Sequence, residues 1–312
     1  MTLRIKILFL ALLACVAFLA VKNIYSCELS LQIDKGIYKA AKLGEITNLY
    51  IGSSMFGRGI NINEAEKVGP DSFILAYNGF DPTLELLVIE YLIKHNTAIK
   101  NLYLDMYAYS AAQESKLAES RMIFDSPLSL KIALWQTITR NQENYLALTW
   151  ELFISSGNDI FLLWPLYKKL VANRYHKGAT LGNLSGTTRE ILDSTPVPQT
   201  GTGNINNLQK EAITKIIKLC REHNINLVFI ETPKFFDTIN SGIYSSIMQE
   251  YINLLRENEA KYFISQELIN RLNISGTGYK FSHSDPSLFI DHIHLSTLGS
   301  IEFTRLMTSR IN

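Results

Sequence analysis

Short hydrophobic runs rich in β-branched and aromatic residues recur along the chain, and most of them end in small or polar residues. Such runs are typical of strands buried on both faces of a sheet. Between them lie longer segments with apolar residues at helical spacing, and Asp81 and Pro82 predict the start of one such helix. The predicted strands lie within 45–54, 72–79, 99–110, 224–233 and 261–267, and the predicted helices within 81–95, 208–223, 245–260 and 298–310.

Alternation of strands and helices at this spacing predicts an α/β fold with a doubly wound parallel sheet, three α/β/α layers and a flavodoxin-like arrangement. Sheets of this kind bind ligands at the carboxyl ends of their strands. Here those ends are Gly52 to Ser54, Asn78–Gly79, Asp105 to Tyr107, and the segment after Glu231. We therefore expect a functional site to be built from these four places.

The region from about 111 to 206 interrupts the alternation, because it contains no clear strand. Its aromatic-rich helical stretches are followed by a polar segment, 182–204. We interpret the region as a helical cap inserted into the α/β domain and followed by a flexible loop. Its tryptophans, Trp135, Trp150 and Trp164, either fill the core between cap helices or face a substrate or a membrane surface.

The N-terminus carries an uncharged apolar run from Ile7 to Val21, preceded by Arg4 and Lys6 and closed by Lys22. The run of about 15 residues falls between a signal-peptide core and a spanning helix of about 20. Counting onward to Tyr25 makes a single anchor feasible, because Lys22 can extend towards the membrane interface. We therefore predict an uncleaved signal anchor over residues 1–26, with the α/β domain of residues 27–312 outside, as the positive-inside rule expects. The alternative is a buried helix of the soluble domain.

Charge and cysteine content exclude some function classes. The formal net charge is +1 and no basic stripe is present, so nucleic acid is not an expected partner. No Cys/His spacing indicates a zinc site, and we expect neither a metal nor a cofactor. Beyond the predicted anchor, which contains Cys15, the cysteines are Cys27 and Cys220; they either pair or leave Cys220 as a buried thiol in a helix.

Two weak signals become stronger when they are taken together. Ser54 follows the first predicted strand in a Gly-Ser-Ser turn, which would expose its hydroxyl and leave its N–H free for an oxyanion. A serine needs a base to become a nucleophile, and the base needs an acid to orient it. Asp291 and His294, three positions apart before the last predicted helix, supply both.

These residues resemble the SGNH/GDSL hydrolases from about Ile46 to Asn312. That family carries its serine in a Gly-Asp-Ser or Gly-Ser-Ser turn after the first strand, a glycine after the second, and Asp-x-x-His before the last helix. The stretches IGSSMF, YNGFDP and DHIHLSTLG match these blocks. The resemblance implies Ser54 as nucleophile, His294 as base and then acid, Asp291 as the orienting acid, and the N–H groups of Ser54 and Gly79 as oxyanion donors.

One block departs from the family's Gly-x-Asn-Asp pattern. The third strand ends in LDMYAY, which places Tyr107 near the position of the asparagine that donates to the oxyanion. Asn158, in the stretch SSGND, is the weaker substitute. Asp105 would either tune His294 or make a structural hydrogen bond, and Arg58 would either brace the turn or bind an anionic substrate.

The resemblance implies a serine esterase or O-acyltransferase that acts on acyl, foremost acetyl, esters of cell-envelope polysaccharides or related polymers. The expected partners are the acylated polymer, the inner or plasma membrane through the single N-terminal helix, and a membrane-bound acyl donor, with the catalytic domain on the periplasmic or extracellular side. A catalytically idle SGNH-like domain that binds glycan or serves as a scaffold is the alternative. A metal-dependent hydrolase built on Asp291, His292 and His294 would need further ligands.

Overall fold

The computed structural model describes residues 5, 9–10, 12–17, 36–95, 97–114, 126–139, 203–235, 242–265 and 281–311. The chain divides into two compact units: Met1–Lys39 with Glu119–Arg174, and Ala40–Ala118 with Tyr175–Asn312. The sheet and every described residue of the predicted triad belong to the second unit.

The first unit covers the predicted anchor and much of the predicted cap. Residues 5, 9–10 and 12–17 are helical, and α8 (Leu128–Thr139) contains Trp135. The other two cap tryptophans, Trp150 and Trp164, lie outside the described residues, as does Cys27. Within the described ranges, no helix has both the length and the apolar character needed to cross a membrane.

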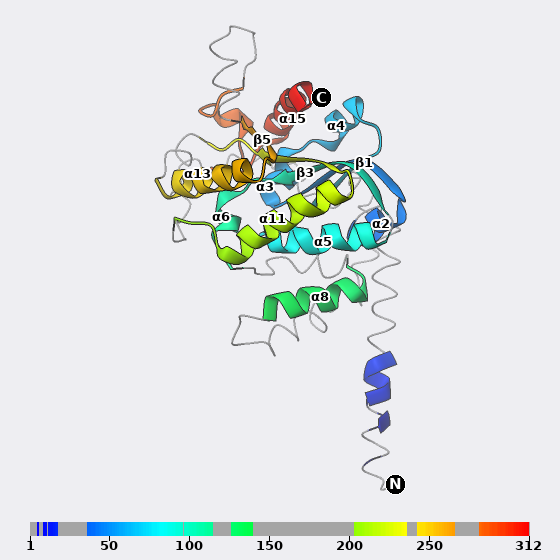
Figure 1. Ribbon diagram of the computed structural model, residues 1–312. Helices are drawn as coiled ribbons and strands as arrows, with labels where there is room; N and C mark the ends of the chain where they lie inside the picture. The colour runs from blue at the N-terminus through cyan, green and yellow to red at the C-terminus, as the bar shows by residue number, and fades with distance from the viewer. Residues whose placement is uncertain are drawn as a thin grey trace. The chain divides into compact units, whose positions relative to one another are not determined.

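The second unit is built on a sheet of five parallel strands in the order β2-β1-β3-β4-β5 (Figure 1). The predicted α/β class and parallel sheet are therefore confirmed, and all five predicted strands are present. The strands are β1 (Glu45–Gly52), β2 (Ser72–Ala76), β3 (Ala98–Asp105), β4 (Asn226–Glu231) and β5 (Lys261–Ile264).

The helices connect and cover the strands, and α5 shows why they begin where they do. Asp81 caps α5 by accepting a hydrogen bond from the Leu84 N–H at 3.0 Å, and Pro82 occupies the first helical position, as predicted. The described helices with residues in this unit are α2 (Gly36–Lys42), α3 (Ser54–Gly59), α4 (Ile62–Val68), α5 (Pro82–Lys94), α6 (Ala108–Ala111), α11 (Asn207–Glu222), α13 (Gly242–Glu257), the 3₁₀ turn η3 (Pro286–Leu288) and α15 (Thr297–Ile311).

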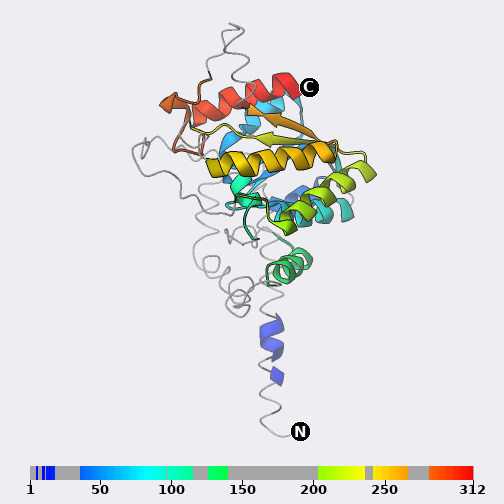
Figure 2. The same cartoon turned by 60° about the vertical axis from the view of Figure 1, so that its left-hand side comes forward.

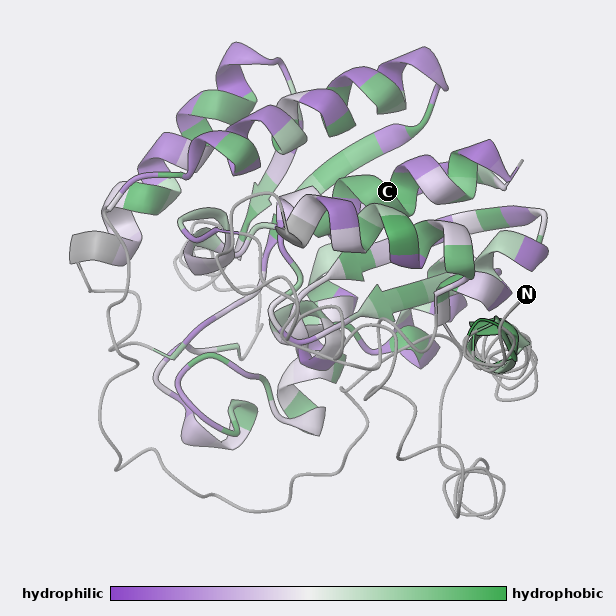
Figure 3. Ribbon diagram, turned by 90° about the horizontal axis from the view of Figure 1, so that it is seen from below, coloured by the Kyte–Doolittle hydropathy of each residue, from purple (hydrophilic) through white to green (hydrophobic). Residues whose placement is uncertain are grey.

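Helices cover both faces of the sheet (Figures 1 and 2). On one face, α15 packs with α3 and α4 over Tyr50, Tyr103 and Ile230. On the other face lie α5 and α11, and Tyr251 of α13 meets the ring of Phe229. The strands are mostly hydrophobic, whereas the helices carry hydrophobic and hydrophilic residues on different sides (Figure 3). This is the pattern expected when the strands are buried on both faces and each helix has one side in water.

Candidate active site

Ser54 is the first residue of α3, directly beyond the carboxyl end of β1. Ser53 is the N-cap, with its hydroxyl accepting a hydrogen bond from the Met55 N–H at 3.2 Å. The chain therefore turns from strand to helix within two residues. This sharp turn leaves the Ser54 side chain half-buried at the carboxyl edge of the sheet.

Asp291 and His294 lie in a turn that immediately precedes α15. Phe289 and Leu295 form an antiparallel bridge, and the Ile290 N–H donates to the His294 carbonyl at 2.9 Å, so the segment closes on itself. Inside it, Asp291 Oδ1 accepts the N–H groups of Ile293 (2.9 Å) and His294 (2.8 Å). The aspartate thus fixes the backbone of the histidine that it also orients.

The structure joins the three predicted residues in one line of hydrogen bonds. His294 Nε2 lies 2.9 Å from Ser54 Oγ, and His294 Nδ1 lies 2.8 Å from Asp291 Oδ2. With Nδ1–H donated to the carboxylate, Nε2 is the nitrogen with a free electron pair, and it faces the serine hydroxyl. This is the tautomer that can remove the Ser54 proton.

The charge state of Asp291 suits this role. Burial alone would raise its pKa, but hydrogen bonds from the His294 ring and from the Ile293 and His294 N–H groups outweigh burial and lower the pKa below its ordinary value. Asp291 is therefore ionised at neutral pH and can stabilise an imidazolium that forms on His294.

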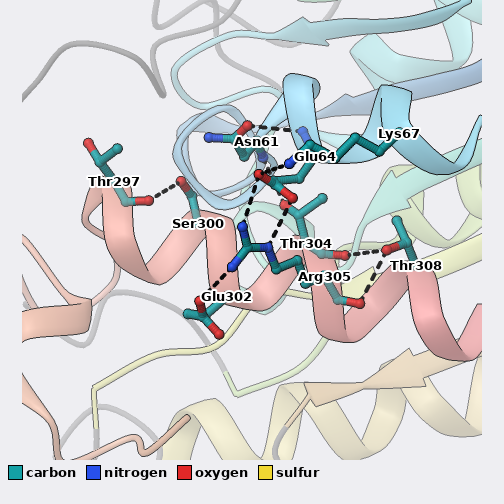
Figure 4. A network of polar contacts seen from close by, with 9 residues as sticks. All are labelled: Asn61, Glu64, Lys67, Thr297, Ser300, Glu302, Thr304, Arg305 and Thr308. Carbon is teal, nitrogen blue, oxygen red and sulfur yellow. Dashed lines mark hydrogen bonds and ion pairs between the residues drawn. The ribbon is translucent and has the colours of Figure 1, made fainter. Parts of the chain in front are cut away.

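Packing between α15 and the α3–α4 segment sets the distance between Ser54 and His294, which are 240 positions apart in sequence. The Thr304 hydroxyl accepts the Asn61 N–H at 2.8 Å, and Arg305 pairs with Glu64 at 2.9 Å (Figure 4). At the start of α15, a Cβ on Gly299 would lie 2.0 Å from the Leu288 carbonyl oxygen. Any side chain at position 299 would therefore push α15 away from Leu288 and disturb the turn with His294 that precedes the helix.

The carboxyl end of β2 lies beside the turn that carries Ser54. The Tyr77 N–H donates to the Gly52 carbonyl at 3.1 Å, and the Phe80 N–H closes a turn on the Tyr77 carbonyl at 3.2 Å. Gly79 occupies this turn with φ of 63°, a left-handed conformation that favours glycine, and it is exposed. In the described part of the chain, neither the Ser54 nor the Gly79 N–H makes a hydrogen bond, and their role as oxyanion donors stays a prediction.

Tyr107, expected near the position of a third oxyanion donor, is half-buried beyond the end of β3. Burial raises the pKa of its hydroxyl, and the negative charges of Asp105 and Asp291 add to this effect. The hydroxyl is thus a neutral donor, and no described residue accepts a hydrogen bond from it. Its role as an oxyanion donor stays a prediction.

Several other sequence candidates also have places in the structure. Asp105 accepts hydrogen bonds from Ser53, whereas both ring nitrogens of His294 are bound to other residues. Of the two roles expected for Asp105, the structure therefore shows the structural hydrogen bond and not a contact with His294. Arg58, at the end of α3, makes no hydrogen bond or ion pair within the described ranges that would brace the turn. Asn158 lies outside the described residues.

The two histidines of the DHIH stretch lie in different surroundings. His292 is buried, and its ring lies edge-on to the Phe235 ring with 5.9 Å between the ring centroids, whereas His294 faces Ser54. No group of three or more His, Cys, Asp or Glu residues that could hold a metal ion occurs in the part of the chain that the structure describes.

A buried polar group that the sequence did not single out lies beyond the end of β4. Lys234 is 1% exposed; its Nζ donates to the Thr232 carbonyl at 2.9 Å and lies 3.7 Å from Glu231. Burial lowers the pKa of Lys234, while the charges of Glu231 and Asp105 oppose that shift. The one signal in the sequence was a charged residue, Glu231, at the end of a hydrophobic run.

Comparison with known proteins adds nothing to this geometry. No family model matches the chain, and no curated protein matches it in a sequence search. The chemistry of the site therefore has to be argued from its residues.

Proposed function

We propose that this chain is a serine-dependent esterase or O-acyltransferase of the SGNH type. The observation that carries the proposal is the continuous hydrogen-bond line from Ser54 through His294 to Asp291. Serine, histidine and an ionised carboxylate in this order are the groups that nucleophilic acyl transfer requires. Their place at the carboxyl edge of a parallel sheet is where such folds bind ligands.

The proposed reaction has two steps. His294 Nε2 takes the Ser54 proton as Oγ attacks the acyl carbonyl, and Asp291 stabilises the imidazolium. The N–H groups of Ser54 and Gly79 donate to the oxyanion. The ester C–O bond then breaks, the alcohol leaves with the proton from His294, and the acyl group stays on Ser54. Water or a sugar hydroxyl, deprotonated by His294, releases the acyl group and restores the serine.

The exposure of the site supports an acyl group carried on a large molecule. The Asp291 side chain is 37% exposed, and Asn78 and Gly79 at the neighbouring strand end are exposed. A polymer can reach such a site without entering a deep cavity. We therefore propose acyl, foremost acetyl, esters of envelope polysaccharides or related polymers as substrates, with residues 1–26 as the membrane anchor and a membrane-bound protein as the acyl donor where the reaction is a transfer.

The test is labelling of the full chain with a fluorophosphonate probe, followed by identification of the modified residue. We expect an adduct on Ser54 in the wild type, none in Ser54→Ala, and wild-type labelling in Ser284→Ala, which removes an exposed serine that is hydrogen-bonded to Ser282 and not to the triad. Turnover of p-nitrophenyl acetate with and without a glycan acceptor then separates hydrolysis from transfer. A wild type without a Ser54 adduct would contradict the enzyme proposal and favour a domain that binds glycan.

A further inference from the structure

Ser53, the residue before the nucleophile, holds the strand-to-helix turn together. It is 1% exposed, its hydroxyl accepts the Met55 N–H, and its carbonyl accepts the Gly57 N–H at 3.0 Å. The position of Ser54 therefore depends on where the Ser53 side chain is fixed.

The Asp105 carboxylate fixes it. Asp105 Oδ2 accepts the Ser53 N–H at 3.2 Å and also the Ser53 hydroxyl. Asp105 ends β3, the strand beside β1, and the two strand ends are very close. A Cβ added to Gly52 would lie 2.3 Å from the Asp105 Cβ, so only glycine at position 52 permits this approach. Gly52, Ser53 and Asp105 thus form one tightly packed unit under the nucleophile.

Asp105 does not act on the triad histidine directly. His294 Nδ1 is bound by Asp291 and Nε2 faces Ser54, so the ring has no nitrogen left for a second carboxylate. Asp105 is 4% exposed, and its position is coupled to β4 because the Met106 N–H donates to the Ile230 carbonyl at 2.8 Å. The charges of Glu231, the last residue of β4, and of Lys234 beyond it also act on the Asp105 carboxylate.

We propose that Asp105 is a positioning residue, which through its two hydrogen bonds to Ser53 holds the Gly-Ser-Ser turn so that Ser54 Oγ faces His294. This role rests on the proposed function, because it matters only if Ser54 is a nucleophile. A displacement of about 1 Å at a reacting group can lower a rate about 10²-fold, so loss of either partner should affect the chemical step rather than the binding of substrate.

The experiment compares single and double variants. The rate of fluorophosphonate labelling and the kcat and KM for p-nitrophenyl acetate are measured for Ser53→Ala, Asp105→Ala, the double variant and Asp105→Asn. We expect Ser53→Ala and Asp105→Ala each to lower kcat and the labelling rate by about 10- to 100-fold with KM nearly unchanged. The double variant should be no slower than Asp105→Ala, because both changes remove the same interaction. Asp105→Asn, which keeps an accepting oxygen, should recover most of the rate.

Glu85→Gln is the matched control. Glu85 is a second buried carboxyl group near Asp105, and among the described residues it makes no hydrogen bond with Ser53, so its replacement should leave the labelling rate unchanged. Thermal unfolding of each variant shows that the folded protein is being measured, and Ser53→Thr, which keeps the hydroxyl, provides a second conservative variant that should label faster than Ser53→Ala.

The outcomes separate the two proposals. A wild type that carries no adduct on Ser54 would overturn the proposed function and the positioning role with it. Three results in a labelled wild type would overturn the positioning role and leave the proposed function standing. The Ser53 and Asp105 variants could be labelled at the wild-type rate, their effects could multiply in the double variant, or the variants could change KM alone.

Discussion

Polar side chains at the two ends of the sheet differ in how fully they are hydrogen-bonded. Near the amino ends of the strands, polar side chains form a row of hydrogen bonds across all five strands, which we call the asparagine row. Asn48 donates to Ser72 at 3.2 Å, and Asn101 donates to Asn48 at 2.9 Å. On the other side of Asn101, Asn226 donates to Asn101 at 3.0 Å and Lys261 donates to Asn226 at 2.8 Å. The members of the row are therefore Ser72, Asn48, Asn101, Asn226 and Lys261.

At the carboxyl ends, buried polar atoms are left without partners. Asp105 Oδ1, Glu85 Oε2 and Thr232 Oγ1 make no hydrogen bond in the described part of the chain. Burial raises the pKa of both carboxyl groups and lowers that of Lys234. At the amino ends the buried hydroxyl of Thr97, just before β3, is an exception to the satisfied row.

The difference indicates what each end is for. A satisfied row stabilises the register of the strands, whereas unsatisfied and perturbed groups cost stability and collect where chemistry is done. We therefore expect substitutions of the carboxyl-end residues that form the triad or hold the Gly-Ser-Ser turn to lower activity more than stability, and substitutions in the asparagine row to lower stability more than activity.

The largest expected effect is the loss of activity in His294→Gln. Without a base for Ser54, the rate of fluorophosphonate labelling should fall by at least about 10³-fold. The free energy of unfolding should change little, since His294 is partly exposed. His292→Gln is the control: it removes a buried ring packed on Phe235 and should lower the free energy of unfolding by about 1–2 kcal/mol while the folded protein is still labelled within a few-fold of the wild-type rate. Equal loss of labelling in both variants would contradict the assignment of His294 as the base.

The next effect is a change in how stability depends on pH. Burial raises the pKa of Asp105 to about 6, against its hydrogen bonds to Ser53 and the charge of Lys234. Between about pH 4 and pH 6 the folded protein therefore keeps a proton that the unfolded chain has lost, so the free energy of unfolding falls as the pH rises through this window. Asp105→Asn should remove on the order of 2–3 kcal/mol of this fall, measured by urea unfolding from pH 4 to pH 7.

A row substitution gives the matched control, because it adds or removes no titrating group. Asn101→Leu should lower the free energy of unfolding by the same amount at every pH in this window. A pH dependence that is unchanged in Asp105→Asn would show that another buried group, such as Glu85, carries the proton.

The contrast between the ends also shows what the sequence could predict. The strands are hydrophobic runs, buried in β2 and towards the carboxyl ends of β1, β3 and β4 and only partly buried in β5, so composition alone identifies them. The cap of α5 at Asp81 is a local pattern. Asp291 and His294 are three positions apart, and their pairing is local too. The asparagine row and the bond from Ser53 to Asp105 are not local, because they depend on strand order and register. An asparagine at a strand start or an aspartate at a strand end looks the same in sequence whether or not it has a partner across the sheet.

The smallest of the three effects belongs to the asparagine row, and it should be confined to stability. Asn101 lies in the middle of the row, where its side chain donates to Asn48 and to the Thr47 carbonyl and accepts from Asn226. Asn101→Leu removes these three hydrogen bonds and should lower the free energy of unfolding by about 1–3 kcal/mol in urea. The labelling rate of the folded protein should stay at the wild-type value, because the row crosses β1 at Asn48, in the middle of the strand, and none of its hydrogen bonds involves Ser53, Ser54 or Asp105.

The exposed end of the row sharpens this expectation. Lys261 donates to Asn226 at 2.8 Å from an exposed position, where water can replace the lost bond. Lys261→Met should therefore change the free energy of unfolding by no more than about 0.5 kcal/mol. A loss as large as that of Asn101→Leu would mean that the row acts as one cooperative chain whose exposed end matters as much as its centre. A slower labelling rate in either variant would mean that the two ends of the sheet are coupled, and stability and activity could then no longer be assigned to separate ends.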